Sequence, residues 1–419
     1  MEKIIIPTRE KVEADISLPG SKSISNRALV IGALAEGETT LKNFLQSEDT
    51  DVMKGCLTAL GLEIEHSVEE LLIRGRGGEI PAGRAHLDTI NSGTTMRFLT
   101  GLVSLGKGSY NLDGNRRMRQ RPIEPLLACL RRLGVNARSK KGNGCPPVKV
   151  KTAGIKGGDC ELPGDISSQF LSSLLLSGPY AEKEITIRVE GALASKPYIS
   201  LTLRLMEDFG VTVENEDFTL FRIPSGQKYH GRNYQIEGDA SSASYFWAAA
   251  AITGGRVRVT NVGENSIQGD ARFAALLGKM GARVRGGSNW LEVSGPLKRG
   301  IEVDLNDMPD TVPTLAVAAL FAPGRTEIRN VANLRYKESD RLRALFTELS
   351  RIGAKVEELP DGLIVEGADL HGAEIETYRD HRIAMALSLA GLRIPGIEIR
   401  DPDCVNKTFP TFFDLFLSL

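Results

Sequence analysis

The hydrophobic and polar positions along the chain form a pattern that recurs at a long and regular interval. Five amphipathic segments each end in a glycine that is followed by a strand-like run. These glycines are Gly61, Gly134, Gly210, Gly281 and Gly353, and the intervals between them are nearly equal. Because glycine adopts the left-handed conformation at little cost, each segment predicts a helix that ends at a glycine C-cap.

A second kind of helix recurs in step with the first. Six segments open with polar residues and then become almost wholly apolar. Their markers are Ser23, Thr94, Ser168, Ser242, Thr311 and Arg382, which are spaced at nearly the same interval as the glycines. Helices that are apolar on nearly all sides belong in a core, and short strand patterns follow each of them, so the sequence predicts six units of strands and two helices.

The ends of the chain predict how these units are grouped. The sixth unit stops at Leu419 before its final strands, and the N-terminal stretch KIIIPTREKVEADISLP is expected to supply them. This predicts two lobes of three units each, residues 1–19 with 239–419 and residues 20–238, with the active site in the cleft between them. Each of the two predicted crossings, near residues 19–20 and 238–239, contains a glycine, which suits a hinge.

The polar starts of the six apolar helices point to a site for small anions. A helix N-terminus offers unpaired backbone N–H groups and a partial positive charge. Basic residues recur near these starts and near strand ends: Lys22, Arg27, Arg97, Arg117, Lys337, Arg341, Arg382 and Lys407. The preference of Ser, Thr and Asp for N-cap positions explains any one helix start equally well. The recurrence of the cations at the same places in the repeat favours anion binding.

The composition argues against large or membranous partners. The 52 Lys and Arg residues nearly balance 53 Asp and Glu residues, so the net charge does not favour a polyanion. The basic stretch NRRMRQRP lacks the interleaved aromatic residues that stack on bases, so no nucleic acid is expected. The N-terminal stretch lacks the apolar core of a signal peptide, no apolar run approaches the roughly 20 residues that span a bilayer, and the five cysteines form no CxxC pair. We therefore expect a cytoplasmic protein that binds no membrane.

The sequence predicts neither a metal nor a nucleotide cofactor. The segment LPGSKS is not a Walker A loop, because Ser21 separates Gly20 from Lys22 and position 15 is an aspartate where the motif needs a glycine. No GxGxxG occurs. The five histidines are scattered and form no HExxH motif, so no metal site is expected.

Nine segments that cover the whole chain carry a resemblance to a known family. In order they read LPGSKSISNRAL, NSGTTMRFL, RRMRQRPI, SSQFLSSLL, SKPYISLT, EGDASSASYF, NLRYKESDRL, YRDHRIAM and DPDCVNKTFPTFF. Together they resemble the 5-enolpyruvylshikimate-3-phosphate synthases. The resemblance implies the α/β enolpyruvyl transferase fold, a two-lobed inside-out α/β barrel of six repeated strand-helix units, and no cofactor. We expect a monomer.

The resemblance also implies an activity. The family transfers the enolpyruvyl group of phosphoenolpyruvate to the 5-hydroxyl of shikimate-3-phosphate and releases phosphate, in chorismate and aromatic amino acid biosynthesis. The reaction is an addition followed by an elimination, which requires an acid and a base whose roles reverse. Glyphosate occupies the phosphoenolpyruvate site in this family.

Matching positions imply the site residues. For phosphoenolpyruvate they are Lys22, Gly93, Thr94, Arg117, Gln169, Arg341, Arg382 and Lys407. For shikimate-3-phosphate they are Lys22, Ser23, Arg27, Ser167, Ser168, Gln169, Ser195, Tyr198, Asp310, Asn333 and Lys337. The catalytic candidates are Lys22, Asp310 and Glu338. Two alternatives stay open: Glu338 as a structural ion pair with Lys337 or Arg341, and His381 as a residue that only orients its neighbours.

Three positions depart from the usual family motif. The stretch NAGTAMRP reads NSGTTMRF here, with Ser92 and Thr95 each in place of Ala and Phe98 in place of Pro. Phe98 lies one turn beyond Thr94 on the same helix face, where we expect it to shift the helix slightly and to weaken glyphosate rather than catalysis.

Two rival functions are considered. The related transferase that acts on a UDP-sugar in cell-wall synthesis has a Lys-Asn pair near its N-terminus and a cysteine on a mobile loop. Here the pair is Lys22-Ser23, and residues 113–121 contain no cysteine. A non-enzymatic protein that binds anions or RNA would account for the cations but not for the carboxylates beside them.

Overall fold

The chain folds into two compact units, each built from one repeated motif. The computed structural model describes residues 2–67 and 70–419. Unit 1 comprises Met1–Pro19 and Glu237–Leu419, and unit 2 comprises Gly20–Ile236. The second crossing of the chain between the units therefore falls two positions before the predicted boundary at 238–239. Met1, the first residue of the predicted range 1–19, lies outside the described residues.

The motif is seen most simply in residues 84–153 of unit 2. Its elements are β6 (Arg84–Asp88), α3 (Gly93–Val103), β7 (Lys107–Asp113), α4 (Glu124–Arg132), β8 (Asn136–Ser139) and β9 (Val148–Ala153). Strands β6 and β7 are parallel across α3, whereas β7 and β8 both pair antiparallel with β9. The sheet order is thus β6-β7-β9-β8.

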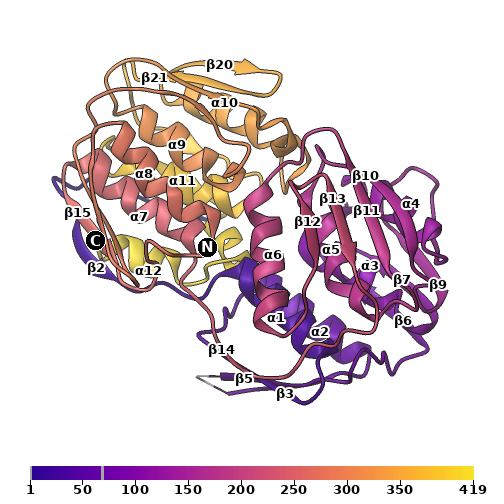
Figure 1. The fold of residues 1–419 in the computed structure, drawn as a ribbon. Coiled ribbons are helices and arrows are strands. Elements are labelled where there is room, and N and C mark those ends of the chain that lie inside the picture. Colours follow the sequence, from indigo (N-terminus) through magenta and orange to yellow (C-terminus); the bar gives the residue numbers. More distant parts are fainter. Residues whose placement is uncertain (1, 68–69) are drawn as a thin grey trace. The chain divides into compact units, whose positions relative to one another are not determined.

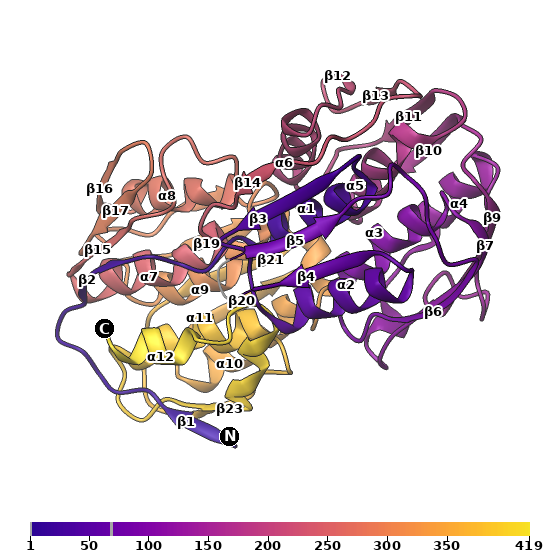
Figure 2. The ribbon, with the colours of Figure 1, turned by 90° about the horizontal axis from the view of Figure 1, so that it is seen from below.

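The other two sheets of unit 2 have the same order. They are β10-β11-β13-β12 and β14-β3-β5-β4. Their strands are β3 (Glu38–Lys42), β4 (Glu63–His66), β5 (Glu70–Arg74), β10 (Gly158–Pro163), β11 (Ile185–Glu190), β12 (Glu214–Glu216), β13 (Leu220–Ile223) and β14 (Asn233–Gln235). Strand β14, at the end of the unit, pairs in parallel with β3 at its beginning, as Figure 2 shows. The last strand of unit 2 therefore completes its first repeat.

Unit 1 repeats this arrangement with the help of the N-terminal strands. Its sheets are β16-β17-β15-β2, β18-β19-β21-β20 and β1-β23-β22. Their strands are β1 (Lys3–Ile5), β2 (Glu13–Ile16), β15 (Arg256–Val259), β16 (Arg283–Gly286), β17 (Leu291–Ser294), β18 (Glu302–Asp304), β19 (Thr326–Arg329), β20 (Lys355–Leu359), β21 (Gly362–Glu366), β22 (Glu374–Ile375) and β23 (Glu398–Arg400).

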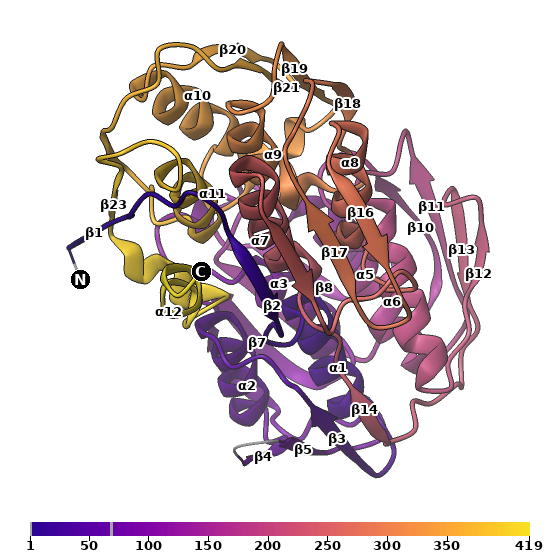
Figure 3. The same cartoon turned by 90° about the vertical axis from the view of Figure 1, so that its left-hand side faces the viewer.

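The two N-terminal strands go to different repeats. Strand β1 pairs antiparallel with β23 in the sixth repeat, beside the yellow C-terminal part of the chain in Figure 3. Strand β2 instead pairs in parallel with β15 in the fourth repeat, where it takes the place that β6 has in the second. The expectation that both strands complete the sixth repeat is therefore correct for β1 and wrong for β2.

The almost wholly apolar helices form the core of each unit. In unit 2 these are α1 (Lys22–Leu34), α3 and α5 (Ser168–Ser177), and in unit 1 they are α7 (Ala240–Thr253), α9 (Val312–Ala319) and α11 (His381–Gly391). Every residue of α3, α7, α9 and α11 is buried. Within each unit the three core helices contact one another, as Figure 1 shows. The sheets lie outside these helices, which is the inside-out arrangement of the enolpyruvyl transferase fold.

The amphipathic helices end as the sequence predicts. They are α2 (Glu48–Ala59), α4, α6 (Lys196–Asp208), α8 (Phe273–Lys279) and α10 (Arg341–Arg351), and a short α12 (Phe412–Leu417) follows β23. The second residue after each of the first five is the marked glycine, with φ of 86°, 89°, 90°, 106° and 90° in chain order. These positive values confirm the predicted glycine C-caps, because only glycine adopts them without strain.

The glycines near the two crossings are required by local packing. A Cβ atom on Gly20 would lie 1.8 Å from the carbonyl oxygen of Asn43, and one on Gly238 would lie 2.4 Å from Oδ1 of Asn261. Any side chain at either position would collide with these groups. None of the helices that the structure describes is long and apolar enough to cross a membrane.

Candidate active site

In unit 2 the predicted residues gather at the first turns of the three core helices. Lys22 and Ser23 open α1, Gly93 and Thr94 open α3, and Ser168 and Gln169 open α5. Lys22, Ser23 and Gln169 are the residues of α1 and α5 that are not buried. The partly exposed residues of these otherwise buried helices therefore lie at the helix N-termini. Backbone N–H groups at a helix N-terminus favour anions.

Contacts between the helices place these starts side by side. The Gln169 side chain donates a hydrogen bond to Oγ1 of Thr94 at 3.1 Å, which joins the first turns of α5 and α3. One turn further on, the Ser173 hydroxyl donates to the carbonyl oxygen of Arg97 at 2.6 Å. Successive contacts in the same direction show that α3 and α5 run parallel, with their N-termini at one end.

Side-chain caps account for part of the polar pattern at these starts. Ser21, Ser92 and Ser167 are the N-cap residues of α1, α3 and α5, and each accepts a hydrogen bond from a backbone N–H of the first turn. For Ser167, a predicted shikimate-3-phosphate residue, the donor is the N–H of Gln169 at 3.3 Å. One cap satisfies only some of the unpaired N–H groups of a helix start, so capping does not conflict with an anion site at these helix ends.

Arg27 is a buried cation with uncharged partners. Its side chain is 2% exposed. The guanidinium donates to two hydroxyls, Oγ1 of Thr202 at 2.7 Å and Oγ of Ser172 at 3.3 Å, and to the carbonyl oxygens of Ser23 and Tyr198. Burial lowers the pKa of Arg27 to about 10, so the group still carries its charge at neutral pH. A buried positive charge of this kind is suited to a phosphate ligand.

The substituted residue Phe98 lies against this cation. The guanidinium carbon of Arg27 is 5.2 Å from the centre of the Phe98 ring, which is a cation–π distance. Phe98 is itself buried within α3, which stays helical from Gly93 to Val103. The departure from the family's proline therefore supplies an aromatic face to a predicted substrate residue.

Gly93 makes room for two further arginines. A Cβ atom at this position would lie 2.5 Å from Nη1 of Arg97 and 2.5 Å from Nη2 of Arg121. Both arginines are almost fully buried, and they donate to carbonyl oxygens of Gly93 and Pro122 (Arg97) and of Asn91 (Arg121). A side chain at this position would therefore displace one or both guanidinium groups.

Three more predicted residues of unit 2 lie beyond the core helices. Arg117 is half-buried at the N-cap of a short 3₁₀ helix, Met118–Gln120. Ser195 is the N-cap of α6 and is left-handed, with φ of 59°, although it is not a glycine. Tyr198, in the first turn of α6, accepts from Arg27 through its backbone carbonyl. Left-handed non-glycine residues are strained, and they concentrate at functional sites.

In unit 1 the predicted residues form one ion-pair cluster around Asp310. The Asp310 carboxylate lies 3.6 Å from Nζ of Lys337, 3.1 Å from Nη1 of Arg341 and 2.8 Å from Nη2 of Arg382. Arg341 opens α10, and Arg382 is the second residue of α11. One carboxylate therefore meets three cations, two of which lie in the first turns of helices.

Arg341 is surrounded by carboxylates. It is 1% exposed and binds Glu338 at 2.9 Å and Asp380 at 2.8 Å in addition to Asp310. Burial lowers the pKa of Arg341, but the attraction of the Asp380, Glu338 and Asp310 charges outweighs it and raises the pKa above its usual value. The Glu338–Arg341 contact is the ion pair that a purely structural role of Glu338 requires. The same contact also fixes the position of the Glu338 carboxylate.

Two other predicted residues of unit 1 are buried. Asn333 is 8% exposed on the 3₁₀ helix Ala332–Tyr336, and its Oδ1 has no hydrogen-bond partner in the described part of the chain. Since a buried amide oxygen normally accepts a hydrogen bond, this atom is suited to a ligand hydroxyl. Lys407 is 6% exposed at the end of Pro402–Lys407. His381 is fully buried, with Nδ1 3.6 Å from Asp380.

Sequence reasoning missed several residues of both clusters. Asp380 binds Arg341, accepts from the Ser339 hydroxyl at 2.9 Å and caps α11. Asp380 belongs to the segment YRDHRIAM, in which an aspartate before a helix is typical of an N-cap, so the motif provides no reason to assign it to the site. Arg121 stands in RRMRQRPI, and its signal was the recurrence of arginine there. Tyr245, whose hydroxyl is 3.4 Å from Nη1 of Arg382, gave no signal at all, because a tyrosine in an apolar helix reads as core.

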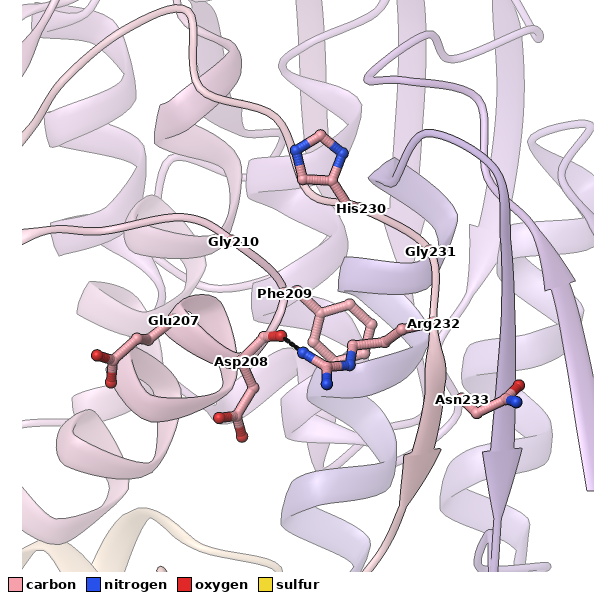
Figure 4. Close-up of a pocket in the computed structure, with 8 residues that line it drawn as sticks. All are labelled: Glu207, Asp208, Phe209, Gly210, His230, Gly231, Arg232 and Asn233. Atoms are coloured by element: carbon pink, nitrogen blue, oxygen red, sulfur yellow. Dashed lines mark hydrogen bonds between the residues drawn. The ribbon is translucent and has the colours of Figure 1, made fainter.

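A separate pocket in unit 2 contains none of the predicted residues. Its volume is about 490 Å³, and it is lined by Glu207, Asp208, Phe209, Gly210, His230, Gly231, Arg232 and Asn233 (Figure 4). Arg232 donates to the backbone carbonyl of Asp208 and lies over the Phe209 ring at 5.9 Å. Its cation is thus already held by the protein, which does not favour an anion site. Among residues 2–67 and 70–419, no three His, Cys, Asp or Glu side chains are grouped in a way that could hold a metal ion.

The chain is similar to known proteins along its whole length. The model of the family described as EPSP synthase (3-phosphoshikimate 1-carboxyvinyltransferase) matches residues 6–416. Two proteins named 3-phosphoshikimate 1-carboxyvinyltransferase are 46% identical (Trichormus variabilis, covering 100% of this chain and 99% of that protein) and 47% identical (Vibrio atlanticus, 99% and 98%).

A solved structure agrees with these relatives. The EPSP synthase from Acinetobacter baumannii is 32% identical and superposes with a TM-score of 0.82, over 99% of this chain and 97% of that one. The match of family model, relatives and fold covers both units and all six repeats. The chain belongs to the EPSP synthase (3-phosphoshikimate 1-carboxyvinyltransferase) family and is a carboxyvinyl transferase.

Proposed function

We propose that this enzyme transfers the enolpyruvyl group of phosphoenolpyruvate to the 5-hydroxyl of shikimate-3-phosphate, and that residues of both units serve the same two substrates. The reaction belongs to chorismate and aromatic amino acid biosynthesis. The observation that carries the proposal is the Asp310 cluster, in which carboxylates and cations meet at the first turns of α10 and α11. An enolpyruvyl transfer needs both kinds of group, because cations bind the two anionic substrates and carboxylates add and remove protons during the reaction.

Phosphoenolpyruvate is assigned to cationic and hydrogen-bonding groups. Its proposed partners are Lys22, Gly93, Thr94, Arg117, Gln169, Arg341, Arg382 and Lys407. A carboxylate and a phosphate together need several charge-assisted donors, and guanidinium groups provide these in pairs. The buried positions of Arg341, Arg382 and Lys407 support this assignment, since a buried cation binds an anion more strongly than an exposed one does.

Shikimate-3-phosphate is assigned to the hydroxyl-rich helix starts and to the uncharged surroundings of Arg27. Its proposed partners are Lys22, Ser23, Arg27, Ser167, Ser168, Gln169, Ser195, Tyr198, Asp310, Asn333 and Lys337. Arg27 and the N-termini of α1 and α5 suit the phosphate. Asp310 and Oδ1 of Asn333 accept hydrogen bonds and suit ring hydroxyls.

The reaction proceeds by addition and then elimination. A proton is added to C3 of phosphoenolpyruvate while the oxygen of the 5-hydroxyl forms a bond to C2 and loses its own proton. The bond from C2 to the phosphate oxygen then breaks, a proton leaves C3, and the double bond forms again. We assign the proton transfers to Glu338 and Asp310, and assign Lys22 as donor to the bridging oxygen of the departing phosphate. No step needs a metal or another cofactor.

We also propose that the enzyme is a cytoplasmic monomer with no nucleic-acid or membrane partner. The five cysteines, which are free thiols in the structure, support a reducing compartment. The near balance of acidic and basic residues supports the lack of a polyanionic partner.

Phosphate release with different acceptors tests the function. Purified enzyme and phosphoenolpyruvate are combined with shikimate-3-phosphate, with UDP-N-acetylglucosamine, or with no acceptor. We expect phosphate release with shikimate-3-phosphate alone. Release with the UDP-sugar would assign the chain to the cell-wall reaction, and no release with any acceptor would refute a transferase.

A further inference from the structure

A strained turn precedes the residue that binds Arg341. Tyr378 and Arg379 are consecutive non-glycine residues in the left-handed region, with φ of 55° and 54°. The next residue, Asp380, caps α11 and binds Arg341 and Ser339. Two successive residues of this kind persist only where surrounding contacts hold them, because each is strained.

One helix holds this turn on both sides. At the start of α10, Nε of Arg341 donates to Asp380 at 2.8 Å and Nη2 donates at 3.2 Å. Two turns later on the same helix face, Oε1 of Glu348 accepts from the Tyr378 hydroxyl at 2.6 Å, and Oε2 accepts from the N–H of Glu376 at 3.2 Å. Helices α10 and α11 contact each other, and Figure 3 shows them side by side.

Glu348 is otherwise difficult to explain on this helix. Its side chain is fully buried, and its cationic partner Arg351, at 3.3 Å, is itself half-exposed. Burying a carboxylate is costly unless its oxygens are hydrogen-bonded. Here the two oxygens bind the N–H of Glu376 and the hydroxyl of Tyr378, which is the first residue of the left-handed pair.

We propose that Glu348 and Tyr378 are positioning residues for the transfer: they hold the left-handed turn against α10, so that Asp380 fixes the Arg341 guanidinium in the orientation that meets phosphoenolpyruvate. The inference rests on the proposed role of Arg341 toward that substrate. Neither Glu348 nor Tyr378 touches a substrate in this arrangement.

Tyr378 is the donor in its contact with Glu348. Burial, and then the hydrogen bond to Glu348, raise the pKa of Tyr378 to about 12. The phenol therefore stays protonated at neutral pH and remains a hydrogen-bond donor to Glu348.

Steady-state kinetics of Tyr378→Phe tests the proposal. The variant loses one hydrogen bond, and we expect the KM for phosphoenolpyruvate to rise about threefold to tenfold, the range given by the loss of one such bond. The KM for shikimate-3-phosphate should change less than about twofold. Tyr110→Phe is the matched control, because its hydroxyl also makes one partly buried hydrogen bond, to the carbonyl of Ala82 at 2.7 Å in unit 2. It should lower the unfolding temperature without changing either KM.

Two further variants separate positioning from a structural role. Arg379→Gly, introduced into Tyr378→Phe, relieves the left-handed strain at position 379. It should therefore lower the raised KM for phosphoenolpyruvate most of the way back to the wild-type value. In an Arg341→Lys background, Tyr378→Phe should have little further effect on that KM, because both act through one group. Glu348→Gln, which keeps the shape and one acceptor, provides a second route if Tyr378→Phe does not fold.

The outcomes are distinguishable. A lower unfolding temperature for Tyr378→Phe with an unchanged KM for phosphoenolpyruvate, or equal rises in both KM values, would overturn the positioning role. An unchanged KM for phosphoenolpyruvate in Arg341→Lys alone would overturn the proposed function of Arg341 instead.

Discussion

The buried arginines Arg27 of unit 2 and Arg341 of unit 1 lie in different electrostatic environments. In unit 2, the partners of Arg27 among the described residues are hydroxyls, carbonyl oxygens and the face of an aromatic ring. In unit 1, Arg341 contacts the carboxylates of Asp310, Glu338 and Asp380. An anion that approaches Arg27 meets a charge without a carboxylate beside it, whereas one that binds Arg341 competes with carboxylates already there.

This difference fits two different tasks. A site that only binds a phosphate gains from a preformed cation in uncharged surroundings, because the whole attraction is available to the ligand. A site that transfers protons needs carboxylates beside the cations, and it gives up some attraction to keep them in place. We therefore propose that unit 2 holds the phosphate of shikimate-3-phosphate, whereas unit 1 combines cations for phosphoenolpyruvate with the carboxylates for proton transfer. Lys22 is the exception, because it takes part in proton transfer from unit 2.

Lys22→Met should give the largest effect, and it probes that exception. Lys22 opens α1 next to residues assigned to both substrates, and methionine keeps most of its length without the charge. We expect turnover to fall by roughly the upper end of the range for a general acid, about 10⁴-fold, with an unchanged circular dichroism spectrum. A near-normal rate would remove Lys22 from the mechanism.

Glu338→Gln should lower turnover by about 10²–10⁴-fold, because glutamine keeps the shape and a hydrogen bond to Arg341 but cannot exchange the proton. Pre-steady-state and steady-state phosphate release measure this loss. If turnover falls less than about threefold, Glu338 is a structural partner of Arg341 and the proton transfers belong to Asp310.

Much of the fold follows from the sequence, because it depends on local patterns. The glycine C-caps and the buried helices are determined by residues near one another in the chain, so the repeating pattern predicts them. It does not predict the place of β2, since the alternating pattern of that strand suits any open sheet edge, and only the assembled unit shows that the fourth repeat lacks its first strand. Such a choice depends on which edges remain unpaired after folding.

The sequence predicts the candidate site only in part, as it does the fold. Motifs identify the residues that we propose for substrate binding, such as Arg27 and Arg341. They do not show that Phe98, on a different helix from Arg27, lies under its guanidinium, or that Asp380 binds Arg341 across two helices. Contacts between distant parts of the chain arise from tertiary packing, so the electrical contrast between the units becomes visible only in the structure.

Stability measurements test the contrast independently of activity. Arg341→Met removes the cation shared by the fully buried Asp380 and the partly buried Glu338 and Asp310, and we expect it to lower the free energy of unfolding by about 3–5 kcal/mol, chiefly because Asp380 stays buried without this partner. Arg27→Met removes a buried charge that has no ionic partner in the described part of the chain, while Ser172 and Thr202 keep their mutual hydrogen bond at 2.9 Å. It should cost no more than about 1 kcal/mol. Equal costs in chemical denaturation would contradict the contrast.

The pH dependence of stability gives a smaller effect in unit 1. Burial first, and then the Asp310 charge, raise the pKa of Asp270 to about 6, above the roughly 3.9 of an unfolded aspartate. The folded state therefore binds this proton more tightly. The resulting stabilisation is complete below about pH 3.9 and is lost as the pH rises through about 6.

Asp270→Asn tests this dependence. The variant keeps an acceptor for the Ser241 hydroxyl but removes the titration. Between about pH 4 and pH 6.5 the free energy of unfolding of the wild type should fall relative to the variant by about 2–3 kcal/mol. Denaturation at several pH values measures the difference. Parallel curves for the two proteins would show that Asp270 does not titrate in this window.

Calorimetric titration of shikimate-3-phosphate tests most directly the claim that Arg27 is the preformed phosphate site. The ligand is titrated without phosphoenolpyruvate into the wild type, Arg27→Met and Arg341→Lys. We predict that Arg27→Met weakens binding by at least about tenfold, because a charge-assisted hydrogen bond is lost, and that Arg341→Lys changes it less than about threefold. A larger loss in Arg341→Lys than in Arg27→Met would contradict the claim.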